Sequence, residues 1–154
     1  MSHLLRELLK RDEGFVPHAY EDSLGFLTIG YGRLIDRLKG GRITKDEAEF
    51  LLDNDISDKT TELTRKLPWV LQLDEVRSTV LLAMAFQMGT DKLLTFKNTL
   101  KAVWDRDYKA AAAGMRASLW YRQTPQRAER LAKAMETGDI SALELPSAFD
   151  RVPG

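Results

Sequence analysis

Strand-like residues in this 154-residue chain are confined to a short segment near its start, and helical patterns follow almost to its end. The pair 19–20 and the run 26–29 are strand-like, and residues 22–25 between them are typical of a turn. Gly14 fits the left-handed position after a first helix, and Pro17 cannot continue that helix. We therefore predict an α+β fold, mostly α, with a small N-terminal β-ribbon lobe and a C-terminal helical lobe.

Helix signals recur along the rest of the chain. Residues 44–47 form a capping box that starts a helix to about residue 52, and a second helix is expected over 55–67, before Pro68. The segment 74–88 is apolar on several faces, which is typical of a helix at the centre of a bundle. Further helices are predicted over 94–105, 108–117 and 125–135.

The length allows one large core, or a large lobe with a small one. We predict a single domain over 1–154, with one sub-lobe at 13–60 and another formed by 61–154 together with 1–12. The absence of cysteine excludes disulfides and a thiol nucleophile. His3 and His18 are too few for a histidine-based metal site, so no metal and no other cofactor is expected.

The net charge is zero but is unevenly distributed. Residues 1–60 hold 9 basic and 12 acidic residues, whereas residues 61–154 hold 14 and 11. The most basic stretch, 116–133, would attract an anionic polymer, although solvated helix faces without a partner explain it equally well. No apolar run reaches the roughly 18 residues of a membrane span, and the charged N-terminus makes a poor signal peptide. We expect synthesis in the cytosol and no membrane insertion.

Two carboxyl residues and one hydroxyl residue, Glu13, Asp22 and Thr28, lie in and beside the strand-like segment. Such groups suffice to hydrolyse a glycosidic bond: one carboxyl protonates the leaving oxygen, and the other, with the hydroxyl, holds a water for attack. Glu13 is expected at a helix C-terminus, where the negative end of the helix dipole disfavours an ionised carboxylate, so its position suits a proton donor. A cleft between two lobes is a usual place for such a site.

Each of these residues also has an ordinary structural explanation. Glu13 is one of several charges expected to be solvated at a helix end. Asp22 suits a turn because its side chain bonds nearby backbone amides, and Thr28 suits a strand. The spacing of the three together is what favours a catalytic interpretation.

The chain resembles the phage-type lysozymes, the endolysin family, whose catalytic pattern is Glu, eight residues, Asp, five residues, Thr. Glu13, Asp22 and Thr28 match it in type and spacing, as do their neighbours Asp-Glu-Gly and Thr-Ile-Gly-Tyr-Gly. Further matches follow in family order and cover nearly the whole chain; they lie at 43–49, 86–89 and 120–128. The resemblance implies a two-lobed lysozyme-like fold.

The resemblance also implies a muramidase that cleaves the β-1,4 bond between N-acetylmuramic acid and N-acetylglucosamine in peptidoglycan, with inversion. Glu13 would be the general acid, Asp22 and Thr28 would hold the water, and Arg127 would pair with Glu13 across the cleft. The family positions expected to contact substrate are Leu34, Phe86, Gln87 and Arg127, and Arg33 and Tyr121 are expected to support the site. The family further implies a monomer that stays in the host bacterial cytoplasm until a holin-type route releases it to the cell wall.

This chain departs from the family in three places. Arg33 stands where the family often has a histidine, and it could pair with Glu13, Asp22 or an acidic residue elsewhere. The segment between Arg33 and Thr44 is shorter than in the best-known member, and Gly114 replaces a polar residue that contacts sugar there.

Three other functions compete with the muramidase. A lytic transglycosylase needs one glutamate and no water-holding aspartate. A non-catalytic wall-binding protein could lose one of the three catalytic groups. This chain keeps Glu13, Asp22 and Thr28, which argues against both alternatives. A nucleic-acid binder would use the arginine-rich helix after Pro125, but the first lobe is acidic and no DNA-binding motif is present. We expect no nucleic-acid partner.

Overall fold

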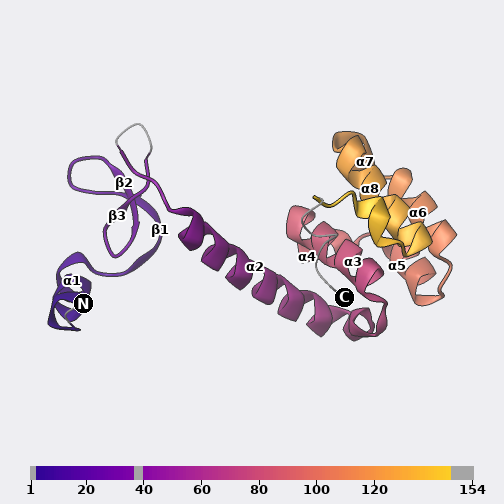
Figure 1. Ribbon diagram of the computed structural model, residues 1–154, viewed down its shortest axis with the longest axis horizontal. Helices are drawn as coiled ribbons and strands as arrows, with labels where there is room; N and C mark the ends of the chain where they lie inside the picture. The colour runs from indigo at the N-terminus through magenta and orange to yellow at the C-terminus, as the bar shows by residue number, and fades with distance from the viewer. Residues whose placement is uncertain (1–2, 37–39, 147–154) are drawn as a thin grey trace. The chain divides into compact units, whose positions relative to one another are not determined.

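The computed structural model describes residues 3–36 and 40–146 and divides the chain into two compact units, Met1–Asp53 and Asn54–Gly154 (Figure 1). The first unit contains one complete helix, a small sheet and the start of the next helix, and the second unit is helical. The predicted α+β class, with its small N-terminal ribbon lobe and helical C-terminal lobe, is confirmed. The assignment of residues 1–12 to the helical lobe, and the other predicted sub-lobe bounds, stay predictions.

The N-terminal unit begins with helix α1, His3–Glu13, which ends where the sequence predicts. The Gly14 N–H donates to the Lys10 carbonyl at 3.1 Å, and Gly14 has a φ of +70°, a conformation that glycine adopts without strain. The helix therefore ends at Glu13, and the chain enters the first strand of the sheet at Val16.

The sheet is antiparallel and has the strand order β1-β2-β3. Its strands are β1, Val16–Glu21, β2, Leu27–Gly30, and β3, Arg33–Leu34. Strands β1 and β2 and the turn between them agree with the prediction. Strand β3 was not predicted, because two residues are too few to show an alternating pattern.

Helix α2, Lys45–Lys66, is one continuous helix that begins in the N-terminal unit and continues into the helical unit. The predicted capping box at its start is present: the Glu47 N–H donates to Thr44 Oγ1 at 3.2 Å, and the Thr44 N–H donates to Glu47 Oε1 at 3.0 Å. The predicted interruption between residues 52 and 55 is wrong. The segment loses its regular apolar spacing there, but it contains no glycine or proline that would break the helix.

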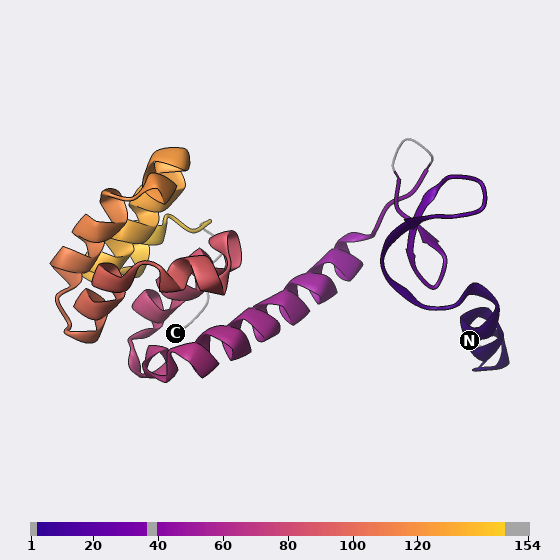
Figure 2. The same cartoon turned by 180° about the vertical axis from the view of Figure 1, so that it is seen from behind.

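The helical unit is built around α3, Glu75–Met88, as the apolar sequence of this segment predicts. Its buried side chains Val80, Leu81, Met84 and Ala85 belong to one core with residues of α5, α6 and α8. The other elements are η2 (Pro68–Gln72), α4 (Thr90–Leu94), α5 (Lys97–Trp104), α6 (Tyr108–Arg116), α7 (Leu119–Gln123), α8 (Pro125–Thr137) and η3 (Ile140–Leu143). Figure 2 shows α8 beside α6, with which it makes its most extensive packing.

Two details of this unit differ from the prediction. The helix expected over 94–105 is present but shorter, as α5, and α4, which ends at Leu94, was not predicted. The five-residue α7 was not predicted, since it is shorter than the two turns that a periodic pattern needs.

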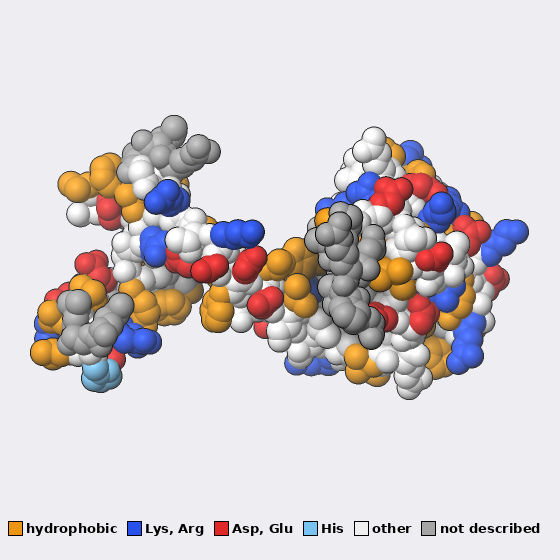
Figure 3. Space-filling view, viewed as in Figure 1, with side chains coloured by type: hydrophobic (Ala, Val, Ile, Leu, Met, Phe, Trp, Pro, Cys, Tyr) orange, Lys and Arg blue, Asp and Glu red, His pale blue; other side chains and the backbone are white. Residues whose placement is uncertain are grey.

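The basic stretch 116–133 does not form a uniform positive surface. Arg116 donates to Glu129 and to Glu136, each at 3.0 Å, so the most N-terminal charge of the stretch is neutralised. On the face seen in Figure 3, acidic and basic side chains are interspersed over the helical unit. No helix in the described part of the chain is long and apolar enough to cross a membrane.

Candidate functional site

Glu13 is the last residue of α1, and its side chain reaches the turn that joins β2 to β3. A Cβ atom placed on Gly32 would lie 2.7 Å from Glu13 Oε2 and 3.2 Å from its Cδ. The carboxyl group therefore occupies the space that any side chain at residue 32 would need. Glu13 itself is exposed, so the carboxyl is accessible to a substrate.

Replacing Gly32 with alanine should displace the Glu13 carboxyl without unfolding the protein. Gly32 has a φ of +75°, which an alanine adopts only with strain, and its Cβ would displace the Glu13 carboxyl. We expect any activity that depends on the Glu13 carboxyl to fall at least about tenfold, since misplacement of a catalytic group by about 1 Å can cost 10²-fold. Gly40→Ala is the matched control, because Gly40 also has a positive φ, +89°, but no atom beyond its chain neighbours stands within 4 Å of the added carbon. Equal activity in the two variants would contradict the positioning role of Gly32.

Asp22 closes the turn between β1 and β2 with one of its two carboxylate oxygens. Oδ1 accepts the N–H groups of Leu24 at 2.9 Å and of Phe26 at 2.8 Å. The backbone supports the same turn, since the Asp22 N–H donates to the Phe26 carbonyl at 2.9 Å. Within the described residues Oδ2 accepts no hydrogen bond, so one oxygen fixes the turn and the other remains available to a water or a substrate.

Thr28 lies in the central strand β2, opposite Tyr20 of β1 and Leu34 of β3. Its residue surface is 4% exposed, and its hydroxyl donates to the Phe26 carbonyl at 3.0 Å. Asp22 and Thr28 are thus bonded to the same residue, one to the N–H of Phe26 and the other to its carbonyl. The structure brings these two predicted groups together through Phe26, and it places half-buried Leu34 beside Thr28.

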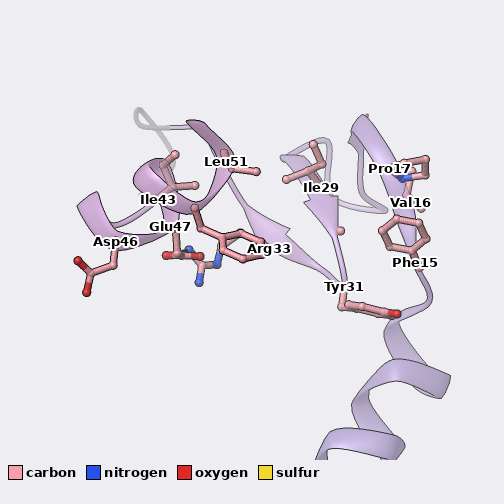
Figure 4. Close-up of a pocket in the computed structure, with 12 residues that line it drawn as sticks. Phe15, Val16, Pro17, Ile29, Tyr31, Arg33, Ile43, Asp46, Glu47 and Leu51 are labelled. Carbon is pink, nitrogen blue, oxygen red and sulfur yellow. Dashed lines mark hydrogen bonds and ion pairs between the residues drawn. The ribbon is translucent and has the colours of Figure 1, made fainter. Parts of the chain in front are cut away.

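An open apolar groove of about 730 Å³ lies beside this region (Figure 4). The rings of Phe15 and Tyr31, with centroids 5.5 Å apart, line one part of it, and Ile43 and Leu51 line another. Its wall includes neither Glu13 nor Asp22 nor Thr28. The groove is therefore separate from the three candidate catalytic groups.

Arg33 is bonded to the start of α2 rather than to either candidate catalytic carboxylate. Its Nη1 donates to Glu47 Oε1 at 2.9 Å and to the Arg42 carbonyl at 3.2 Å. The backbone N–H of Thr44 and then the Arg33 side chain lower the pKa of Glu47 to about 2. Arg33 thereby joins β3 to the capping box of α2.

Arg33→Gln should destabilise the N-terminal unit in a pH-dependent way. The folded-state pKa of Glu47 lies below its ordinary value, so its ionised form stabilises the fold above about pH 4.5, and this contribution is lost as the pH falls through about 2. The variant should therefore unfold at a lower temperature than wild type at pH 7, and the difference should shrink towards pH 2.5. Circular dichroism melts at the two pH values measure it. A difference independent of pH would contradict the role of this ion pair, which is exposed and therefore expected to be weak.

In the helical unit, the predicted substrate-contacting residues Phe86 and Gln87 are adjacent at the end of α3. Phe86 is 42% exposed. Gln87 Oε1 accepts the indole N–H of buried Trp120 at 3.0 Å, and Gln87 Nε2 donates to Thr124 Oγ1 at 3.5 Å. Gln87 is thus held by α7 and by the residue before α8, whereas the Phe86 ring remains accessible.

Tyr121, predicted to support the site, belongs to an ion-pair network. Its hydroxyl donates to Glu129 Oε2 at 2.8 Å, and Arg116 binds both oxygens of the same carboxylate. The hydrogen bond from Arg116 and then that from Tyr121 lower the pKa of Glu129, and the bond to Glu129 raises the pKa of Tyr121. The network ties α6 and α7 to α8.

Arg127 is exposed on α8 and makes no salt bridge with any residue that the structure describes. Its predicted partner Glu13 belongs to the other unit, so the pairing stays a prediction.

Gly114, where the sequence departs from the family, contacts Thr99: a Cβ at residue 114 would collide with Thr99 Oγ1. A side chain at this position would need Thr99 to move.

Sequence reasoning did not single out three residues that organise these positions: Gly32, Phe26 and Glu129. The alternation of Gly30, Tyr31 and Gly32 after a strand was a signal for a special turn, although it does not name Glu13 as the neighbour. No local sequence pattern indicates the other two residues. Phe26 acts through its backbone N–H and carbonyl, and Glu129 acts through a contact between helices.

Comparison with known proteins decides the family. The sequence model of the family described as "Phage lysozyme" matches residues 10–136, a range that includes all three candidate catalytic residues. The chain belongs to the phage lysozyme family. It is accordingly a lysozyme-like hydrolase, and the fold agrees with that membership.

Individual relatives of this chain come from varied sources. The chain is 33% identical to "Probable T4-type lysozyme 1" of Dictyostelium discoideum, over 90% of this chain and 96% of the relative. It is 34% identical to "Peptidoglycan hydrolase gp36" of Pseudomonas phage phiKMV, over 84% of this chain and 15% of that longer protein. It is 30% identical to "Endolysin" of Acyrthosiphon pisum secondary endosymbiont phage 1, over 69% and 70%.

Proposed function

We propose that this phage lysozyme is a muramidase, which hydrolyses the β-1,4 bond between N-acetylmuramic acid and N-acetylglucosamine in bacterial peptidoglycan with inversion at the anomeric carbon. The family supports a lysozyme-like hydrolase, and the relative named as a peptidoglycan hydrolase supports the substrate. No cofactor is needed, because two carboxyl groups and a water molecule supply the chemistry.

Glu13 acts as the general acid and protonates the glycosidic oxygen as the bond to the anomeric carbon breaks. Asp22, through its unbonded Oδ2, accepts a proton from a water that attacks the opposite face of the sugar, and the Thr28 hydroxyl helps to hold that water. Leu34, Phe86 and Gln87 contact the substrate, and Arg127 pairs with Glu13. The observation that best supports the proposal is the difference between the two oxygens of Asp22. Oδ1 holds the carboxylate in place through two hydrogen bonds, and Oδ2 accepts none from the described residues.

Analysis of the products tests the reaction. Purified peptidoglycan digested by the protein should give muramic acid ends that can be reduced by borohydride, and NMR of the first product should show the α anomer. Anhydromuramic ends in the mass spectrum would instead assign the protein to the lytic transglycosylases, and a β anomer would exclude a single displacement by water. Binding to sacculi without any released fragment would indicate a wall-binding protein.

The enzyme is expected to act as a monomer on peptidoglycan, without a nucleic-acid partner. Neutralisation of Arg116 by Glu129 and Glu136 weakens the case for a nucleic-acid surface on the basic stretch. Release from the host bacterial cytoplasm by a holin-type route is the delivery that the endolysin resemblance implies.

A further inference from the structure

A second open pocket, of about 480 Å³, lies in the helical unit and shares no residue with the candidate site. Trp69 and Gln72 of η2 and Asp74 before α3 line one part of its wall, and Trp104 and Arg106, at and beyond the end of α5, line another. The pocket thus combines two indoles with an amide, a carboxylate and a guanidinium. None of these residues has a part in the chemistry proposed above.

The two indoles form an edge-to-face pair, with ring centroids 5.8 Å apart and an interplanar angle of 69°. Trp69 is half-buried against the core of the unit, whereas Trp104 is 61% exposed. An indole that remains this exposed in the free protein can still bury much of its surface against a ligand. Trp69, held by the core, fixes the position of its partner.

The carboxylate in this pocket is held rigidly. Asp74 accepts the N–H of Arg77 at 3.0 Å as the N-cap of α3, and Arg77 Nη1 lies 3.2 Å from its other oxygen. Arg77 is itself fixed, because it donates to the Met135 and Glu136 carbonyls and its guanidinium lies 3.5 Å from the centroid of the Tyr108 ring. Each carboxylate oxygen retains a lone pair, so Asp74 can accept a ligand hydroxyl without reorganising.

The side chains of Gln72 and Arg106 are exposed, and neither makes a side-chain hydrogen bond or ion pair in the described part of the chain. Both side chains can donate hydrogen bonds to a ligand in the pocket, and the Gln72 amide oxygen can also accept one. A wholly apolar ligand would desolvate these groups and Asp74 without giving them partners, which is unfavourable. A nucleic acid would bring phosphates towards the Asp74 carboxylate. A pyranose ring fits both requirements, since it has an apolar C–H face and a rim of hydroxyl groups.

We propose that this pocket, centred on Trp69 and Trp104, binds an N-acetylglucosamine ring of the glycan strand as a non-catalytic anchor. The choice of this sugar rests on the proposed function, because peptidoglycan is the glycan that the enzyme would meet. The C–H face of the ring stacks on Trp104, and the hydroxyls or the acetamido group bond Asp74, Gln72 and Arg106. Such an anchor retains the enzyme on an insoluble wall between successive cleavages.

Titration of the ¹⁵N-labelled wild-type protein with the β-1,4-linked tetramer of N-acetylglucosamine tests the site. The chain has three tryptophans, so it has three indole N–H signals, and Trp120 reports separately because its indole bonds Gln87. We expect the Trp69 and Trp104 signals to shift with the same saturation curve. Unchanged Trp69 and Trp104 signals at saturating tetramer, or shifts confined to Trp120, would overturn the proposal.

Trp104→Ala should weaken binding to purified sacculi about two- to tenfold, as expected for the loss of an aromatic contact, while hydrolysis of short soluble wall fragments stays at the wild-type rate. Leu71→Ala is the matched control, because Leu71 is 71% exposed in η2 but does not line the pocket. Gln72→Ala, which removes an exposed amide, gives a second variant if Trp104→Ala folds poorly. Wild-type sacculus binding in a folded pocket variant would overturn the anchor.

The two proposals fail in different ways. If the protein releases no muramic acid ends, the proposed reaction fails, whereas the indole titration needs no cleavage and is read independently. If the protein is active but its Trp69 and Trp104 signals do not respond to the tetramer, the reaction stands and the anchor is excluded.

Discussion

Glu13→Gln is expected to abolish lysis of peptidoglycan while leaving the fold intact. Glutamine has the same shape as glutamate, so it keeps the end of α1 and the contact with Gly32, but it cannot donate a proton to the leaving oxygen. General acid catalysis contributes typically about 10²–10⁴-fold, and we expect at least this loss. Release of reducing ends from purified peptidoglycan measures the rate, and the circular dichroism melt checks the fold.

Glu7→Gln is the matched control for this experiment. Glu7 lies on the same helix and is exposed, so the substitution removes the same charge without touching the candidate site. It should retain the wild-type rate. Wild-type turnover by Glu13→Gln would remove Glu13 from the mechanism, and an equal loss of turnover in both variants would indicate an effect of charge on wall binding instead.

The parts of this fold that could be predicted are those determined by local chemistry. Gly14 and Pro17 end α1, and Thr44 with Glu47 starts α2, because each signal acts within a few residues through backbone hydrogen bonds. The Asp22 turn belongs to the same class, since its side chain bonds amides two and four residues ahead. The structural explanation of Asp22, that it forms a turn, is therefore correct. It does not exclude the catalytic explanation, because the turn uses only Oδ1 and leaves Oδ2 available.

The parts that could not be predicted depend on how elements meet. The partner of Arg33 was left open among several carboxylates, and the choice of Glu47 requires β3 to lie beside the start of α2, fourteen positions further along the chain. The contact between Glu13 and Gly32 likewise depends on where α1 ends relative to the sheet. Arg127 and Glu13 belong to different units, so their pairing remains a prediction from the family alone.

Asp22→Asn is expected to separate the two roles of this residue. The asparagine side-chain oxygen can still accept the N–H groups of Leu24 and Phe26, so the turn and the position of Thr28 should persist. The other carboxylate oxygen becomes an amide nitrogen, which cannot accept a proton from water. We expect the hydrolysis rate to fall by about 10²–10⁴-fold with an unchanged melting temperature.

Two further variants decide what such a loss means. Asp139→Asn is the matched control, because Asp139 Oδ1 accepts the Ser141 N–H at 2.9 Å in a comparable turn of the helical unit, and this variant should keep full activity. Asp22→Ala removes both roles and should lose activity and also melt at a lower temperature, because two backbone N–H groups lose their acceptor. If Asp22→Asn melts as low as Asp22→Ala, the residue acts through the turn; if it keeps the wild-type rate, Oδ2 does not act on the water.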